Sequence, residues 1–193
     1  MNQAQAVWQE KSLLLEQGSI KAFKTGAMDA ERRFFARLEE MGIAADTVEH
    51  DATPTVETSQ HLAQSLPGGR SKSLLVTDKD KRLFLITARG STRVDLKKVG
   101  EAVGARGRLS FAAPTLMQSV LGVEPGHLTP YALINDKARD IDTVVLDQEL
   151  MGEPMIWAHP LRNTASTAVS AEALKAFVSL HAQRVIELSL AAG

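Results

Sequence analysis

The chain has 193 residues, of which 44% are hydrophobic and 23% charged, and its formal net charge is −1 at pH 7. These values are typical of a globular domain with a sizeable core, and the near-neutral charge argues against a non-specific nucleic-acid binder. The absence of cysteine excludes disulfides, thiolate metal sites and cysteine nucleophiles. The sequence contains no apolar run long enough to span a membrane and no secretory signal, so we expect a cytoplasmic protein without membrane contact.

The N-terminal part of the chain divides near Met28. Residues 1–27 are predicted to be an extension that the protein can lose, and residues 28–193 to form the domain. Asp29 is placed to cap a helix that carries Phe34 and Leu38 on its apolar face.

A strand and a helix are predicted next, followed by a hairpin. The strand covers 47–50, and the helix covers 55–66 before the stop at 67–69, which reads Pro-Gly-Gly. The apolar runs 73–77 and 83–87 flank a polar turn, which predicts two strands covered on both faces.

The second half of the chain mixes short helices with further strands. Asp95 opens a helix that ends at Gly104, and 114–121 form another. Ser170 caps a final helix whose apolar face runs to Leu188. Further strands are predicted at 131–134, 143–146, 155–158 and 164–169. Because hairpins outnumber β-α-β units, we predict an α+β fold with a mixed, largely antiparallel sheet surrounded by helices.

Positive charge is concentrated in one stretch. Residues 66–108 hold 11 of the 22 Lys and Arg residues against 4 acidic ones. Such a zone on a neutral protein suits a phosphate-bearing partner held at one face, although charged turns of a solvated hairpin would give the same pattern.

Two loops carry more turn-forming and polar residues than ordinary connections need. They are 122–130, with the spacing Gly126-x-x-x-Pro130, and 159–167, which begins His-Pro-Leu-Arg-Asn-Thr. Loops of this kind can direct backbone N–H and C=O groups at a ligand. The familiar nucleophile, phosphate-loop and dinucleotide motifs are absent, and the five histidines lack metal-ligand spacing, so we expect neither metal nor cofactor.

Lys72 begins an apolar strand directly after a Gly-Gly turn. A lysine there can present a compact cation to a cleft, or it can simply extend along the surface at a strand end. The residues alone leave both interpretations open.

From residue 28 to about 190 the chain resembles the YbaK/ProX family of aminoacyl-tRNA deacylases, and in particular the freestanding branch that removes alanine from mischarged proline tRNA. The resemblance depends on Lys72 and on the segments 83–86, 121–130, 132–136 and 159–167, which occur in the family's order. Ser73 departs from the family, whose members often have Asn after the lysine.

The resemblance implies the editing-domain fold and an ester hydrolase that uses water, with mischarged proline tRNA as substrate and a transient contact with prolyl-tRNA synthetase. It assigns catalysis to Lys72, Gly126 and His159. For His159, a purely structural bond to a backbone carbonyl is an equal alternative. The residues that it assigns to substrate binding are His127, Leu128, Thr129, Pro130, Asn135, Asn163 and Thr164. The basic residues expected to hold the tRNA backbone are Lys79, Lys81, Arg82, Lys97 and Lys98.

Three alternatives stay open at this point. The same family site could act on cysteinyl-, seryl- or threonyl-tRNA, because pocket volume sets the amino acid. The domain could bind tRNA or a synthetase without hydrolysis. It could also be an unrelated α+β binding module whose Gly/Pro loop is only a turn.

Overall fold

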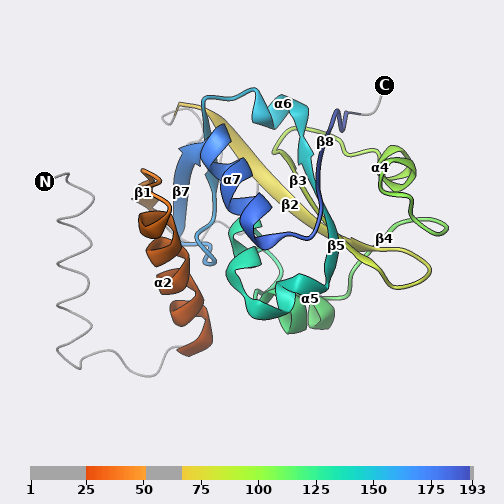
Figure 1. Ribbon diagram of the computed structural model, residues 1–193, viewed down its shortest axis with the longest axis horizontal. Helices are drawn as coiled ribbons and strands as arrows, with labels where there is room; N and C mark the ends of the chain where they lie inside the picture. The colour runs from red at the N-terminus through yellow and green to blue at the C-terminus, as the bar shows by residue number, and fades with distance from the viewer. Residues whose placement is uncertain (1–24, 51–66, 192–193) are drawn as a thin grey trace, which may run out of the picture.

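The computed structural model describes residues 25–50 and 67–191. In this part of the chain eight strands form a sheet with the order β1-β7-β6-β2-β3-β5-β8, and β4 pairs with the far end of β2 (Figure 1). The strands are β1 (Asp46–Glu49), β2 (Gly69–Thr77), β3 (Leu83–Arg89), β4 (Ser110–Phe111), β5 (Ile141–Asp147), β6 (Met155–Ala158), β7 (Ala165–Ser170) and β8 (Val185–Leu188). The pairs β2–β6, β3–β5 and β5–β8 are parallel and the other four antiparallel, which confirms the predicted α+β fold with a mixed, largely antiparallel sheet.

Helices connect the strands and cover both faces of the sheet. They are α2 (Thr25–Glu40), α4 (Leu96–Val103), α5 (Pro114–Leu121), α6 (Gln148–Met151) and α7 (Ala171–His181), with two 3₁₀ turns, η1 (Pro130–Ile134) and η2 (Asp136–Asp140). The predicted caps Asp95 and Ser170 are confirmed, since each side chain accepts hydrogen bonds from amides in the first turn of its helix. The helix predicted at 55–66 lies outside the described residues.

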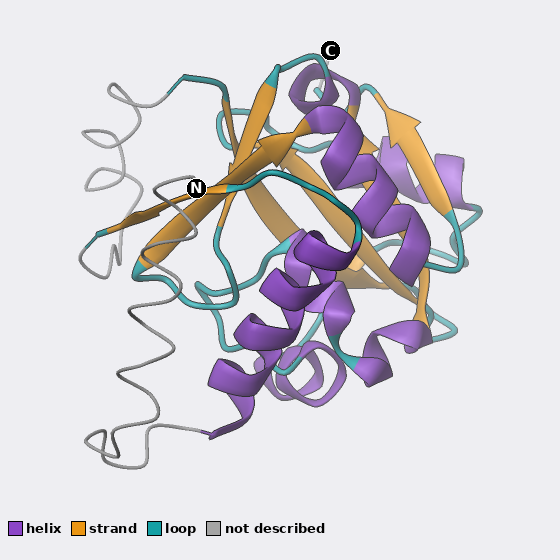
Figure 2. Cartoon of the chain, turned by 60° about the vertical axis from the view of Figure 1, so that its left-hand side comes forward, coloured by secondary structure: helices purple, strands orange, loops and turns teal. Residues whose placement is uncertain are grey.

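The sheet separates two apolar cores. On one face α2, α7 and η1 pack together, with the rings of Phe34, Tyr131 and Phe177 in mutual contact (Figure 2). On the other face α4 packs Val99 and Val103 against the central strands. The strand runs of β2 and β3 are therefore covered on both faces, as their unbroken apolar sequence predicts.

Three sequence predictions are wrong in detail. Residues 131–134 are not a strand: Pro130 opens a 3₁₀ turn that Thr129 caps through its side-chain oxygen. The last helix ends at His181 rather than continuing to Leu188, because Val185–Leu188 pairs in parallel with β5 and completes that edge of the sheet. Asp29 does not cap α2, which already begins at Thr25.

Candidate active site

The strand register places Lys72 on the face of the sheet that α4 covers, because Lys72 alternates with Leu74 and Val76, which pack against the residues of α4. Arg70 lies opposite Trp157, and Trp157 lies opposite a residue of β7. Side chains alternate along a strand, so Lys72, two residues after Arg70, shares its face, while His159 follows directly after the last residue of β6. The predicted strand is confirmed, but it begins earlier than expected, at Gly69, so Lys72 is its fourth residue and not its first.

Hydrogen bonds fix the two histidines at this end of the sheet. His50, which follows β1, bonds through Nε2 to Ser166 Oγ at 3.0 Å, and its ring centroid lies 6.1 Å from that of His159. His159 Nδ1 lies 2.9 Å from the Ala165 carbonyl oxygen. Since a carbonyl only accepts, Nδ1 must carry the proton, and the neutral ring then presents the lone pair of Nε2 as an acceptor.

The electrostatic surroundings keep His159 neutral. Burial lowers the pKa of its imidazole below the usual 6.5, and the positive fields of His50, His127 and Arg70 lower it further, against the opposing effect of the Ala165 carbonyl. His127 of the 122–130 loop is thus one of the charges that act on the His159 ring. A neutral imidazole can accept a proton or a hydrogen bond from a bound hydroxyl or water.

The Lys72 ammonium is held by the turn after β3. Its Nζ donates to the carbonyl oxygens of Gly90 at 3.0 Å and Thr92 at 2.5 Å. An ammonium has three N–H donors, so one remains for a further acceptor. The half-buried side chain is therefore fixed in direction and is not a freely extended surface lysine.

The 122–130 loop has a backbone that only glycine adopts readily. Gly126 has φ +86°, and a Cβ placed there would meet nothing within 4 Å, so the conformation rather than lack of space requires glycine. The His127 amide donates to the Glu124 carbonyl and closes the turn. Thr129 and Pro130 are buried, and Leu128 packs at the edge of the core, so the end of the loop is anchored while its exposed tip carries Gly126.

The 159–164 turn is fixed by Arg162, a residue that the sequence interpretation passed over. Its guanidinium makes two hydrogen bonds of 2.7 Å to Glu49, one of 2.8 Å to Glu31 and one of 2.7 Å to Thr164 Oγ1. Burial acts to lower the pKa of Arg162, but the two carboxylates outweigh it and raise that pKa. Arg162 thus ties the turn, with the half-buried Asn163, to α2 and β1. In the sequence, the only indication of this role of Arg162 is that an arginine stands within a turn rich in Pro, Asn and Thr.

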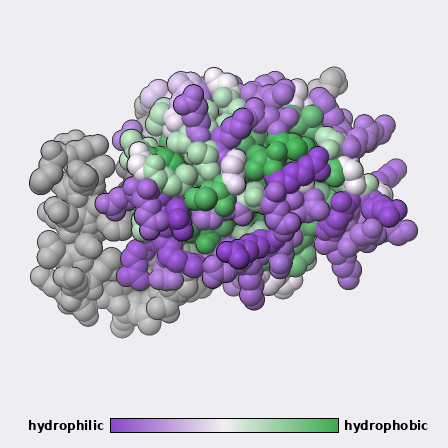
Figure 3. Space-filling view, viewed as in Figure 1, coloured by the Kyte–Doolittle hydropathy of each residue, from purple (hydrophilic) through white to green (hydrophobic). Residues whose placement is uncertain are grey.

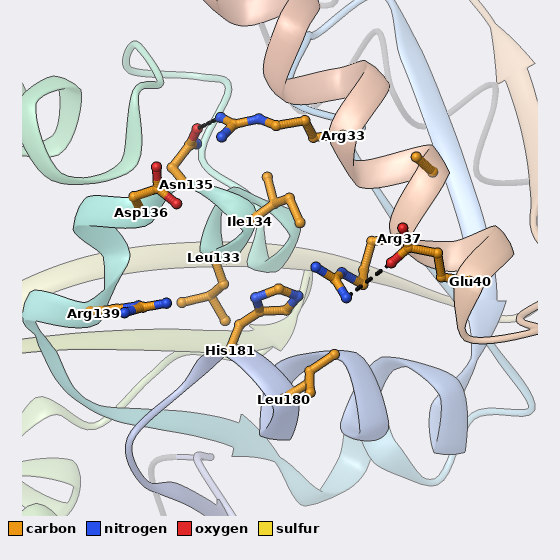
Figure 4. Close-up of a pocket in the computed structure, with 11 residues that line it drawn as sticks. Arg33, Arg37, Glu40, Leu133, Ile134, Asn135, Asp136, Arg139, Leu180 and His181 are labelled. Carbon is orange, nitrogen blue, oxygen red and sulfur yellow. Dashed lines mark hydrogen bonds and ion pairs between the residues drawn. The ribbon is translucent and has the colours of Figure 1, made fainter.

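Asn135 faces a different part of the molecule. Its side-chain NH₂ donates to the Leu121 and Ala132 carbonyls, and its side-chain oxygen accepts from Arg33. It lines a cavity of about 320 Å³ between α2, the 3₁₀ turns and α7, which also has the Arg37 and His181 side chains in its wall (Figure 4). The structure thus does not bring Asn135 together with Lys72 and His159 but makes it a brace of the turn between η1 and η2.

Three of the five expected tRNA-contacting residues, Lys79, Lys81 and Arg82, lie at the opposite end of β2 from Lys72. Lys79 and Lys81 are exposed in the β2–β3 turn, where Arg82 pairs with the buried Asp78 at 2.8 Å. Lys97 and Lys98 lie instead in the first turn of α4, which follows the end of β3 and therefore starts near the Lys72 end of the sheet, while the other end of α4 reaches the β2–β3 turn through the bond of Arg82 to the Gly104 carbonyl. Figure 3 shows hydrophilic residues covering the region where Figure 1 places α4 and this turn. From Lys72 to Thr77, β2 spans roughly 17 Å, so the basic end lies well beyond the reach of the site's own side chains.

Asp78 organises this basic end. It accepts hydrogen bonds from the amides of Asp80, Arg82 and Arg106 and from the Arg82 side chain. Burial would raise the pKa of its carboxyl, but these bonds lower it overall, so the group stays ionised at neutral pH. The ionised Asp78 carboxylate therefore offsets only part of the positive charge of the basic residues around the β2–β3 turn.

The sequence and structure match known editing proteins. The model of the aminoacyl-tRNA editing domain family matches residues 50–177. The chain is 29% identical over 164 residues to the prolyl-tRNA editing protein ProX of Acetoanaerobium sticklandii, covering 83% of this chain and 99% of that protein. It is 31% identical over 153 residues to the prolyl-tRNA synthetase associated domain-containing protein 1 of Danio rerio, covering 78% and 82%.

A solved structure provisionally described as a trans-editing enzyme for prolyl tRNA synthetase shares the fold, with a TM-score of 0.67, 24% identity, and coverage of 85% of this chain and 98% of that one. With the family match over most of its length, the chain belongs to the aminoacyl-tRNA editing domain family. It is an aminoacyl-tRNA deacylase, a hydrolase of the ester between an amino acid and tRNA.

Two negative observations apply to residues 25–50 and 67–191. No helix there is long and apolar enough to cross a membrane. No group of three His, Asp or Glu side chains in these segments is arranged to hold a metal ion.

Proposed function

We propose that the protein deacylates mischarged proline tRNA in trans and that alanyl-tRNAPro is its main substrate. The observation that supports the proposal is the pairing of β2 with β6, in which Arg70 lies opposite Trp157, so that the Lys72 ammonium, held by two carbonyls, and the neutral His159 ring each follow two residues later. The relatives named for prolyl-tRNA editing support the choice of tRNA. The reaction would take place in the cytoplasm, with at most a transient contact with prolyl-tRNA synthetase.

Hydrolysis of an aminoacyl ester needs positioning more than a strong nucleophile, because the ester is already activated. Water adds to the carbonyl carbon, the bond to the ribose oxygen breaks, and that oxygen leaves with a proton. Backbone amides of the 122–130 loop stabilise the developing oxyanion. Nε2 of His159 orients the water, and the neighbouring ribose hydroxyl of the substrate relays the proton. No covalent intermediate forms.

The need for such an enzyme follows from the weak discrimination between small apolar amino acids. A synthetase pocket that accepts proline also accepts alanine, because each missing methylene changes binding by only about 1–3 kcal/mol. A second site that is too small for proline completes a double sieve.

A direct assay tests the proposal and its rivals. The purified protein is incubated with proline tRNA carrying alanine, serine, cysteine or proline, and release of the amino acid is followed. Faster release of alanine than of the other three supports the proposal. Preferential release of serine or cysteine would show the same reaction of the family on a different amino acid. Tight binding of all four tRNAs without release would favour a non-catalytic tRNA-binding module.

The pH profile of deacylation should report the neutral state of His159. Because its pKa lies below the usual 6.5, the imidazole stays neutral as pH falls from 8 to 6.5 and gains a proton only at lower pH. We expect kcat/KM, corrected for spontaneous hydrolysis, to be level across neutral pH and to fall with a midpoint below 6.5. His159→Asn should lower the plateau and abolish the acid limb. A His159→Asn profile with the wild-type midpoint would assign the limb to another group.

Deacylation should weaken with added salt if the basic end of β2 contacts tRNA phosphates. Two or three such contacts predict a fall of about 10- to 40-fold in kcat/KM between 50 and 200 mM salt. The double variant Lys79→Ala, Lys81→Ala should be less active at low salt and less salt-sensitive. Lys175→Ala is the control, because this lysine pairs with Glu187 near the opposite edge of the sheet. An unchanged salt slope in the double variant would exclude the β2–β3 turn from the tRNA contact.

A further inference from the structure

The cavity between α2, the 3₁₀ turns and α7 is lined by residues outside the candidate active site. Its volume of about 320 Å³ lies within the range of cavities that bind small molecules. Three segments far apart in the sequence form its wall, namely the second half of α2, the turns η1 and η2, and the end of α7 (Figure 4). Among the described residues that line it, none belongs to the 122–130 loop or to the 159–164 turn.

Three side chains that carry or can gain positive charge converge on this cavity. Arg37 extends from α2, Arg139 from η2, and His181 is the last residue of α7. Burial lowers the pKa of the His181 imidazole below the usual 6.5, and the positive fields of Arg37 and Arg139 lower it further. Figure 4 shows the Arg37 guanidinium and the His181 ring near the centre, with Arg139 directed toward them from η2. Without an anion between them, these groups repel one another.

Polar atoms of the same side chains lack hydrogen-bond partners. Arg37 Nη1 pairs with Glu40 at 3.0 Å, but Arg37 Nε and His181 Nε2 are shielded from solvent and make no hydrogen bond within residues 25–50 and 67–191. The Arg139 guanidinium has no partner among those residues either, whereas its backbone carbonyl accepts from the Gln183 side chain and holds η2 beside the segment after α7. Buried donors without acceptors are costly, so a ligand that supplies oxygen atoms here would be stabilised.

The other charged residues of the wall leave a positive balance. Glu40 is already paired with Arg37, and Asp136 is exposed at the start of η2. Arg33 adds a further guanidinium, which donates to the side-chain oxygen of Asn135. The lining thus holds three arginines against two carboxylates. Such a site favours an anion, and a guanidinium pairs best with the oxygens of a phosphate or carboxylate.

One side of the cavity is apolar. Leu133 and Ile134 of η1 and Leu180 of α7 line it, and Leu180 is 56% exposed, so it has apolar surface left to contact a ligand. An inorganic ion alone would leave this surface in water. The cavity therefore suits a molecule with an anionic head and an organic body.

We propose that this cavity binds a small phosphate monoester, with its phosphate between Arg37, Arg139 and His181 and its organic group against Leu180. The phosphate oxygens accept hydrogen bonds from Arg37 Nε, from the Arg139 guanidinium and from the protonated Nε2 of His181. A monoester carries up to two negative charges near neutral pH, which matches several cationic donors better than a carboxylate does. The inference does not depend on the proposed deacylase function.

The experiment uses phenyl phosphate as the probe, because it joins a phosphate to an apolar ring. Binding is followed by NMR as the pH titration of the His181 ring, whose resonances are assigned with His181→Gln. Phenyl phosphate should raise the His181 pKa, since the anion offsets the fields of the two arginines. Inorganic phosphate should give the same change only at several-fold higher concentration. Arg139→Gln should weaken the binding of phenyl phosphate roughly tenfold.

Matched variants separate this site from general charge and from the candidate active site. Arg32→Gln removes a positive charge from α2 at a side chain that is 67% exposed and outside the cavity lining, and it should leave binding unchanged. Lys72→Ala should leave it unchanged as well. No change in the His181 pKa with millimolar phenyl phosphate at constant ionic strength would overturn the inference. Benzoate binding as tightly as phenyl phosphate, or equal weakening by Arg32→Gln and Arg139→Gln, would overturn it too.

Discussion

Replacing Lys72 by alanine is expected to lower kcat/KM for alanyl-tRNAPro by about 100-fold or more. In the proposed mechanism the change removes the cation beside the reacting end of the substrate, and charged groups fixed at such positions contribute effects of this size. It also leaves the Gly90 and Thr92 carbonyls without their ammonium donor, so the turn after β3 loses an anchor. Single-turnover deacylation measures the chemical step without product release.

The control for Lys72 must separate charge from turn geometry. Lys72→Arg keeps the charge and both carbonyl bonds within reach, so it should retain more activity than Lys72→Ala. Lys175→Ala removes an exposed lysine of α7, which pairs with Glu187, and should leave the single-turnover rate at saturating protein nearly unchanged. Full activity of a correctly folded Lys72→Ala protein would remove Lys72 from the mechanism.

Phe34→Ala should lower the free energy of unfolding by about 3–5 kcal/mol, the cost of deleting a fully buried aromatic ring. Phe34 is 0% exposed, stacks on Tyr131 with ring centroids 4.2 Å apart, and meets the edge of Phe177. Tyr131 belongs to η1, directly after the glycine-containing loop. We therefore expect a loss of deacylation as well, because the anchor of that loop loosens. Urea unfolding provides the measurement.

A second substitution and a deletion serve as controls for Phe34→Ala. Phe111→Ala alters a phenylalanine that is 65% exposed and should change stability by less than about 0.5 kcal/mol. Deleting residues 2–24 leaves α2 whole, and we propose that this truncation keeps both stability and activity. A Phe34→Ala protein as stable as wild type would show that α2 is not part of the cooperative core.

The sequence was sufficient for elements whose signals are local. Apolar runs, caps and Gly/Pro stops predicted the β2–β3 hairpin, α4, α5 and the start of α7, because each depends on residues close together in the chain. Val185–Leu188 was misassigned because its apolar residues fit a continued helix, and only pairing with β5 makes it a strand. The turn at Pro130 was misassigned for a similar reason, since five buried residues in a row resemble a strand.

The candidate site depends on contacts that no local pattern contains. Lys72 and His159 were chosen by resemblance. Their positions relative to each other depend on the pairing of β2 with β6, which in turn pairs with β7, and β7 pairs with β1. Arg162 was missed because its partners Glu31 and Glu49 lie 131 and 113 residues away.

Strand β2 carries Lys72 near one end and leads into the lysine-bearing turn at the other. Under the proposed function, β2 sets a fixed distance between the ester that is hydrolysed and the tRNA phosphates that the β2–β3 turn contacts. An acceptor fragment of only a few nucleotides would reach the first point but not the second, so its cleavage should scarcely respond to ionic strength. The length of the substrate, and not only its amino acid, would then determine how well the enzyme selects its substrate among many aminoacylated tRNAs.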